Sequence, residues 1–498
     1  MLNADLVISE LLASNVGGHL DFFETDSDFI EIHNRGSSQA ILNGWHLTDD
    51  LNQRFQWEFP VGTTVAAGQR LVVYASGQDG VTSSGQLHTN FKLSPAGEEL
   101  ALVDPEGTVI SGFDPAYPPQ ATNVSYGLRE SNAPLGVFGF MATPTPGGMN
   151  STARVGFTQP PTFSTPGGTF SNSVQVALSG ESGDTQIRYT TNLSKPTENS
   201  TLYTGPILLN STKQIRAIAF RSGYVPSEIV TESYVKLAGD LVNYENSGLP
   251  FSSQVPVVVL ETFGQSISAD NYQNIYFSLF EPQGGQASLT DAVALDSRAG
   301  LKIRGSTSSA FAKKPYALEL HRDGDDTGRN LALLGMGAES DWVLVGPFLY
   351  DRTLNHNRVA FELGDQIGRT TMDTRFIEVF VNTSGDVSSS DYVGVYVLQE
   401  KIKRDPARVD IEKLSSQMIT EPDITGGYII KVDRLDPGDS GFFAGGQMWL
   451  YVEPKESEIE GRPQQRNYLT NYLSDFISAV NTANFRHPTT NQHYGELV

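Results

Sequence analysis

The sequence predicts a multidomain protein in which two all-β, immunoglobulin-like sandwiches precede an α+β domain. Its 498 residues exceed what one hydrophobic core usually organises, so about three domains are expected. Up to residue 236, short alternating apolar runs are bounded by Gly and Pro, which is typical of strands. From residue 250, strand runs mix with helical spacing of apolar residues. We therefore predict domains at 1–150, 157–236 and 250–498.

The charge balance limits the classes of partner. The chain has 57 acidic and 34 basic residues, which gives a formal net charge of −23. A field of this sign repels nucleic acid and anionic membranes, so neither is expected as a partner. The absence of cysteine excludes disulfides, thiolate catalysis and cysteine zinc sites. No apolar run reaches membrane-spanning length, and the first residues do not have the pattern of a signal peptide.

Residues 1–150 are predicted to be all-β, because runs such as "DFIEIHN", "QRLVVYA" and "EELALVD" suit strands and helical periodicity is absent. Glu31 and His33 share one face of the first of these strands. We interpret them as a solvated face rather than a metal site. Trp45 and Trp57 are expected to be core aromatics rather than binding residues.

Several motifs of this segment follow one another in a recognisable order. They are "LVISELLASN", "DFIEIHNRG", "LNGWHLTDD", "WEFPVGTTVAAGQRLVVYASG", "LHTNFKLSPAGEELALVDPEGTVI" and "TPTPGGMN". Together they resemble the lamin-tail domain, which implies an immunoglobulin-like β-sandwich. In bacteria, such domains accompany secreted multidomain proteins, where the resemblance implies an adhesive or structural role.

Residues 157–236 are predicted to form a second small sandwich from strands "VQVAL", "QIRYT" and "QIRAIAF". The elements "YTTNLSKPT", "YTGPI" and "IRAIAF" resemble the C-terminal β-sandwich of chitobiase-type glycosidases. No pair of carboxylates suits glycosidic acid/base chemistry, so we expect a spacer without glycosidase activity. Packing is the favoured role of Tyr189 and Tyr203, and weak glycan contact is the alternative.

A cluster of basic residues surrounds one small-residue loop in "GLKIRGSTSSAFAKKPYALEL". Gly305 permits a turn, Ser306 and the hydroxyl residues after it supply donors, and the fork of Arg304 suits phosphate. Lys313 and Lys314 face opposite ways if they begin a strand, so only one can join Arg304. These parts predict a polyphosphate cradle. Taken alone, the segment favours a hairpin whose lysines protect a sheet edge.

Further motifs favour the phosphate cradle over the hairpin. "SDWVLVGPFLYDRTLNHNRVAFELGDQIG", "RFIEVFVN", "DYVGVYVLQEKIKRDPARVDI" and "ITGGYIIKVDR" follow the loop. With it, they resemble the CotH family of spore-coat and secreted protein kinases, over 250–498. The resemblance implies an atypical protein-kinase-like fold, an extracellular or cell-surface location, and phosphorylation of Ser or Thr in a protein substrate. It also implies ATP and a divalent metal, Mg²⁺ or Mn²⁺.

The family's elements fall on named residues of this chain. They are Arg304, Gly305, Ser306, Lys313, Lys314, Asp341, Trp342, Asp351, Asn357, Gly394, Tyr396, Glu400, Gly426, Gly427 and Tyr428. The resemblance implies that the first five bind the nucleotide. The family often has Arg-Asn in the helix where this chain has His356-Asn357.

We predict Glu400 and Asp433 as catalytic carboxylates. Pairing of Glu400 with Lys314, as a kinase glutamate pairs with its strand lysine, is one of two equal possibilities. The alternatives are that Glu400 is a surface partner of Lys401 or Lys403, and that Asp433 is an ordinary strand-end carboxylate. Trp342 is expected in the core. Asp351 either has the family's role or caps the helix that begins near Thr353.

Three functions are weighed. The first is a secreted, ATP-dependent protein kinase on β-sandwich spacers. The second is a non-catalytic surface adhesion protein with an inactive kinase-like domain. The third is a glycan-binding accessory protein, with surface polysaccharide as partner. Because the family's distal acidic residues would follow Val498, we expect residues 1–498 to bind ATP weakly and not to turn it over.

Overall fold

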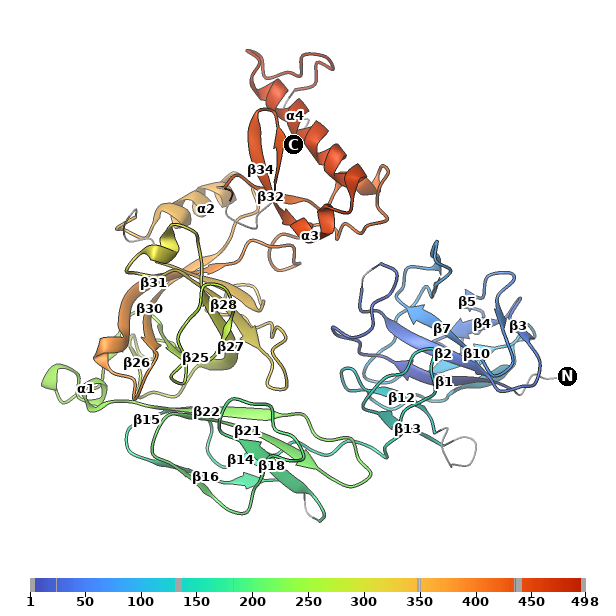
Figure 1. Cartoon of the computed structure of the whole chain (residues 1–498), viewed down its shortest axis with the longest axis horizontal. Coiled ribbons are helices and arrows are strands. Elements are labelled where there is room, and N and C mark those ends of the chain that lie inside the picture. Colours follow the sequence, from blue (N-terminus) through green and yellow to red (C-terminus); the bar gives the residue numbers. More distant parts are fainter. Residues whose placement is uncertain are drawn as a thin grey trace. The chain divides into compact units, whose positions relative to one another are not determined.

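The computed structural model describes residues 5–23, 25–129, 137–181, 183–346, 349, 351–433, 435 and 441–493 (Figure 1). Contacts divide the chain into two compact units. Unit 1 consists of Met1–Gln159, Ser182–Thr185 and Phe220–Ser227. Unit 2 consists of Pro160–Glu181, Gln186–Ala219 and Glu228–Val498. The second sandwich therefore lies largely in the same unit as the α+β domain.

Unit 1 contains a β-sandwich, as predicted. One sheet has the order β13-β12-β1-β2-β7-β9-β8 and the other has the order β11-β10-β4-β5. The strands are β1 (Leu6–Leu12), β2 (Asp28–Asn34), β3 (Ala40–Ile41), β4 (His46–Thr48), β5 (Trp57–Glu58), β6 (Thr64–Val65), β7 (Arg70–Ala75), β8 (Gly80–Val81), β9 (Leu87–His88), β10 (Leu100–Val103), β11 (Val109–Phe113), β12 (Ser125–Leu128) and β13 (Phe138–Met141).

The core of this sandwich confirms one expectation and corrects another. Trp45 and Trp57 are both buried in it, as predicted. Glu31 was expected on a solvated face, but its exposed fraction is 0%. The expectation fails because β2 lies between two other strands, and a polar partner covers the face on which Glu31 lies. Alternation in the sequence identifies the two faces but not what covers them.

The second sandwich is built on a five-stranded sheet of order β15-β22-β21-β18-β19. Its strands are β14 (Thr162–Phe163), β15 (Gly168–Phe170), β16 (Val174–Val176), β17 (Leu178–Ser179), β18 (Gln186–Thr190), β19 (Thr201–Leu202), β20 (Ile207–Leu209), β21 (Lys213–Phe220) and β22 (Val230–Lys236). Tyr189 and Tyr203 pack against its core, and the Tyr203 hydroxyl accepts a hydrogen bond from the amide of Leu178 at 3.0 Å. Both contacts are the packing role favoured from the sequence.

The α+β domain contains a closed barrel of strands in the order β24-β25-β27-β28-β29-β31-β30. A parallel pairing of β24 with β30 closes it, and the other pairs are antiparallel. These strands are β24 (Val257–Glu261), β25 (Gln273–Phe280), β27 (Leu295–Ile303), β28 (Tyr316–His321), β29 (Asp341–Val345), β30 (Thr374–Asn382) and β31 (Tyr392–Glu400). Trp342 is fully buried in the barrel core, as predicted.

The remaining elements of the domain are short strands and helices. They are α1 (Gly239–Val242), β23 (Ser252–Ser253), β26 (Ala287–Ser288), α2 (His356–Gln366), β32 (Ile429–Lys431), β33 (Gly441–Ala444), β34 (Gln447–Glu453), α3 (Glu456–Ile459) and α4 (Pro463–Val480). Strands β32, β34 and β33 form a sheet that packs with α4 around an apolar cluster (Figure 1). No helix in the described part of the chain is long and apolar enough to cross a membrane.

The second sandwich and the barrel share a hydrophobic cluster. Leu237 and Leu241, at the exit of the sandwich, pack with Phe251, Val257 and Phe380 at the barrel. Backbone hydrogen bonds also join the chain after β22 to the barrel, because the amide of Ala238 donates to the carbonyl of Val387 at 2.8 Å. The sequence predicts a spacer here, whereas these contacts make the sandwich a packing partner of the barrel.

Candidate functional site

The predicted phosphate cradle is a loop, residues 304–315, between β27 and β28. The amide of Arg304 donates to the carbonyl of Pro315 at 3.0 Å, which closes the base of the loop. Gly305 has a φ of +85°, and a Cβ placed there would lie 2.1 Å from Ser308 Oγ. Glycine is favoured at this position, because a side chain would be strained at this φ and the Ser308 hydroxyl would have to move. Ser306 is exposed.

Lys314 contacts the loop itself. Its Nζ donates a hydrogen bond to the carbonyl of Ser309 at 2.8 Å, and Ser309 Oγ donates to the carbonyl of Ser306 at 2.6 Å. The amine of Lys314 therefore lies at the hydroxyl-rich part of the loop. Arg304, at the start of the same loop, is exposed. These positions place two cationic side chains and several donors on one short segment.

Lys313 extends the other way, toward β31. Its Nζ donates to the carbonyl of Val395 and lies 4.4 Å from the ring centroid of Tyr396. Two glycines make room for it, because a Cβ at Gly346 or at Gly394 would meet the lysine side chain at 3.1 or 3.3 Å. Burial lowers the pKa of Lys313. The two lysines thus diverge, although both precede β28 rather than begin it.

Glu400 is paired with an arginine. Its Oε1 accepts hydrogen bonds from Arg408 Nη1 at 2.8 Å and from the amide of Gly337 at 3.1 Å, and its Oε2 accepts one from the amide of Asp373 at 2.9 Å. Arg408 also lies over the ring of Trp342, 4.8 Å from the centroid. The predicted pairing of Glu400 with Lys314 is therefore wrong.

The strand register explains why these two residues do not meet. Glu400 lies opposite Trp342, and Trp342 lies opposite Leu318. Lys314 precedes Leu318 by four residues, or about 13 Å along a strand. The loop and Glu400 consequently lie toward opposite ends of the barrel strands.

The alternative partners of Glu400 bind elsewhere. Lys401 Nζ lies 2.7 Å from Asp341 Oδ1, and Lys403 Nζ lies 2.6 Å from Glu339 Oε1 and 2.7 Å from Asp341 Oδ2. Burial raises the pKa of Asp341, but the hydrogen bonds and charges of Lys401 and Lys403 together outweigh it and hold the pKa below its usual value. Together with the Glu400–Arg408 pair, these contacts fix the segment after β31 to the barrel.

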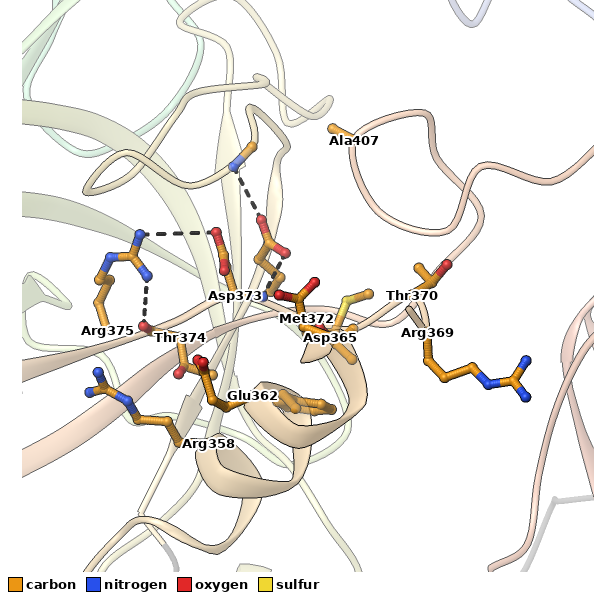
Figure 2. A pocket seen from close by; sticks show the side chains of 14 residues that line it. Arg358, Glu362, Asp365, Arg369, Thr370, Met372, Asp373, Thr374, Arg375 and Ala407 are labelled. Carbon is orange, nitrogen blue, oxygen red and sulfur yellow. Dashed lines mark hydrogen bonds and ion pairs between the residues drawn. The ribbon is translucent and has the colours of Figure 1, made fainter. Parts of the chain in front are cut away.

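A cleft of about 450 Å³ lies beside Glu400, between α2 and the start of β30. Its wall carries arginines Arg358, Arg369 and Arg375 and carboxylates Glu362, Asp365 and Asp373. Figure 2 shows Arg375 directed toward Asp373 and Thr374, whereas Arg369 extends away from them. The cleft has charges of both signs, and the exposed Arg304 loop lies outside it.

Family models match three segments of the chain in the expected order. The Lamin Tail Domain model matches residues 2–115, the Chitobiase/beta-hexosaminidase C-terminal domain model matches 165–231, and the CotH kinase protein model matches 301–496. The predicted architecture is confirmed. A search of curated proteins finds no match. The CotH match includes the Arg304 loop, both lysines and Glu400.

Other residues of the CotH segment have structural contacts. Asp351 Oδ2 accepts a hydrogen bond from the amide of His356, the first residue of α2, at 2.7 Å, so it does contact the start of this helix. The helix begins at His356 rather than near Thr353, and its N-cap residue is Asn355. Asn357 Nδ2 lies 3.4 Å from Gln399 Oε1. Asp433 lies just after β32 and forms an exposed ion pair with Lys431 at 3.0 Å. The two predicted catalytic carboxylates, Glu400 and Asp433, therefore belong to different sheets.

Within the ranges that the structure covers, no group of three or more His, Cys, Asp or Glu side chains could hold a metal ion. The Arg304 loop offers cationic groups and hydroxyl donors of the kind that bind phosphate.

Sequence reasoning missed Arg408 and Gly346. Arg408 is buried beside Trp342. The segment "KRDPAR" contains three cationic residues, and nothing in its pattern shows which of them is buried. Gly346 gives room to Lys313, a relation between distant segments that spacing does not reveal. One feature of the sequence did point to a partner such as Arg408. Glu400 ends an apolar strand, and a glutamate buried at that position needs a cation to pair with.

Proposed function

We propose that the CotH segment is an ATP-dependent protein kinase that phosphorylates Ser or Thr of a protein substrate. The observation that carries this proposal is the loop in which Gly305 adopts a positive φ and Lys314 contacts the hydroxyl-rich turn. In this role the loop holds the phosphates of ATP, and Arg304 and Lys314 offset their charge. Lys313 extends toward β31 instead, where its amine contacts Val395 and Tyr396. In this proposal the protein acts outside the cell or at its surface, which the matches to the CotH and chitobiase-type models support.

The chemistry is phosphoryl transfer. The substrate hydroxyl oxygen bonds to the γ-phosphorus while the bond from that phosphorus to the β–γ bridging oxygen breaks, and ADP leaves. The hydroxyl proton passes to a carboxylate or to solvent. Of the two predicted carboxylates, Asp433 is exposed, whereas Glu400 is buried and already accepts three hydrogen bonds. We therefore assign a positioning role to Glu400 and test Asp433 as the proton acceptor.

The test is transfer of radiolabel from ATP to casein or to the protein itself, with Mg²⁺ or Mn²⁺. We expect transfer by the complete gene product and its loss in Lys314→Ala and in Asp433→Asn. Lys195→Ala, which removes one exposed positive charge from the second sandwich, is the matched control and should retain activity. Equal transfer by Lys314→Ala and by the control would overturn the assignment of the loop.

A non-catalytic surface protein is the second candidate. The hydrogen bonds of Glu400 favour this second candidate. Because the Glu400 carboxylate already accepts three of them, it is not available as one of the two carboxylates expected in a kinase site. In that case, neither the complete gene product nor any variant transfers label. Retention of the protein on surface polysaccharide, unchanged in Lys195→Ala, would then support the glycan-binding role.

A further inference from the structure

Two glutamates are buried side by side in the first sandwich. Glu10 on β1 lies directly opposite Glu31 on β2, and both have an exposed fraction of 0%. A register irregularity lies between Ile8 and Glu10. Residues directly opposite on one face of an antiparallel pair have Cβ atoms about 5 Å apart. Like charges at that separation are unfavourable, and both are removed from water here.

Both carboxylates bind the same segment, residues 143–150, which we call the exit segment because it leads out of the sandwich. Thr145 donates its amide to Glu10 Oε1 at 3.0 Å and its hydroxyl to Glu10 Oε2 at 2.8 Å. Gly147 donates its amide to Glu31 Oε2 at 2.7 Å. Asn150 Nδ2 donates to the carbonyls of Ser9 and Leu128 at 2.8 and 2.9 Å. The exit segment is thus held mainly by polar contacts.

The close approach of the exit segment depends on a glycine in β12. A Cβ at Gly127 would lie 2.4 Å from the carbonyl of Ser9, 2.7 Å from the Met141 side chain and 3.0 Å from Asn150 Nδ2. The absence of a side chain at Gly127 therefore makes room for the exit segment, and any larger residue at this position would displace that segment.

Negative charge exceeds positive charge around the pair when both glutamates are ionised. Arg70 on β7 places its Nε 3.2 Å from Glu31 Oε1. Within the described part of the chain, the other groups that hydrogen-bond to the two carboxylates are neutral, namely Ser9, Ser125, Thr145 and Gly147. Among these contacts, one cation faces two carboxylates when both are ionised.

The geometry also accommodates one proton. Glu31 Oε1 lies 2.5 Å from Ser9 Oγ, and Ser9 Oγ lies 3.3 Å from the carbonyl of Glu31. A protonated Oε1 can donate to Ser9 Oγ while the Ser9 hydroxyl donates to that carbonyl. Ser9 and the amide of Gly147 keep their hydrogen bonds in this arrangement, whereas the ion pair of Arg70 with Oε1 becomes a contact with a neutral carboxyl.

We propose that Glu10 and Glu31 form a proton-dependent latch, which holds the exit segment while the pair retains one proton and loosens it when that proton passes to solvent. Burial, together with repulsion from Glu10, raises the pKa of Glu31 to about 7, against the opposing effects of Ser9, Gly147 and Arg70. Because the folded-state value lies above the ordinary 4.5, the stabilisation is full below pH 4.5 and is lost as the pH rises through 7.

The test is hydrogen–deuterium exchange of the exit segment in the whole protein between pH 5 and 9, corrected for intrinsic exchange rates. We expect protection of residues 143–150 to fall at least tenfold between pH 6 and pH 8.5, relative to β2. Glu31→Gln is a neutral isostere whose amide can donate to Ser9 and whose carbonyl can accept from Gly147. It should keep the segment protected at every pH, whereas Glu58→Gln, at an exposed glutamate, should behave as the wild type.

The same pH dependence in Glu31→Gln as in the wild type would overturn the proposal, as would constant protection of the wild type up to pH 9. If Glu31→Gln does not fold, infrared spectroscopy tests directly whether Glu31 is protonated in the folded protein. Burial also raises the pKa of Glu261 to about 7, so the spectra are recorded in a Glu261→Gln background. The band of a buried protonated carboxyl should still be present at pH 6 and absent at pH 8.5. Its absence at pH 6 would contradict the latch.

Discussion

Glu400 and Arg408 form a buried ion pair, with Arg408 Nη1 2.8 Å from Glu400 Oε1. The pair joins the last residue of β31 to the segment that follows it, and Trp342 packs under the guanidinium. Glu400 therefore positions the chain between the barrel and the sheet of β32–β34. This role explains why the residue is buried, and it separates Glu400 from the phosphate loop.

We predict that Glu400→Ala destabilises unit 2 by about 3–5 kcal/mol, because it leaves Arg408 buried without its carboxylate. Urea unfolding followed by tryptophan fluorescence measures the change. Asp433→Ala is the control, and its exposed ion pair should contribute less than about 1 kcal/mol. A Glu400→Ala protein of unchanged stability that no longer binds ATP would instead place Glu400 in a ligand site.

We predict that Gly305→Ala weakens ATP binding by at least about tenfold, since the new Cβ strains a positive φ and collides with Ser308. Gly284→Ala is the control that separates strain at a positive φ from the contact with Ser308. Gly284 also has a positive φ, +62°, but a Cβ there would meet nothing within 4 Å. Calorimetric titration with ATP measures both variants. Equal weakening in both would indicate a general loss of folding rather than a change in the loop.

We predict that the second sandwich and the barrel unfold in one transition. Leu241 has an exposed fraction of 0% in their shared cluster, so Leu241→Ala should cost about 2–5 kcal/mol and lower the melting temperature of both. Leu208→Ala, at a leucine 60% exposed on the second sandwich, is the control. Differential scanning calorimetry that resolves two independent transitions, with only one shifted by Leu241→Ala, would contradict this coupling.

Much of the fold was predictable because local patterns determine it. Alternation gave the strands of both sandwiches, and the large apolar side chains Trp45, Trp57 and Trp342 were correctly assigned to cores. Barrel closure was not predictable, because the parallel pairing of β24 with β30 joins segments more than a hundred residues apart. The burial of Glu31 was missed for a similar reason, since the exit segment that covers it comes from the far end of the domain.

The candidate site was predictable in part. The turn at Gly305 and the divergence of Lys313 and Lys314 follow from residue types and adjacency. The partner of Glu400 did not follow, because a sequence contains several cations near a glutamate and register decides which one it meets. Lys401 and Lys403 were nearer in sequence, but they bind Asp341 and Glu339.

Binding of ATP to residues 1–498 by calorimetry, with Mg²⁺ or Mn²⁺, tests the central claim most directly. A charge-assisted hydrogen bond to phosphate contributes about 1.5–3 kcal/mol, so Arg304→Ala and Lys314→Ala should each raise Kd by about 10- to 100-fold. Lys195→Ala should leave Kd unchanged. Binding of equal strength in Arg304→Ala, Lys314→Ala and the control would show that the loop does not hold the phosphates and would contradict the account.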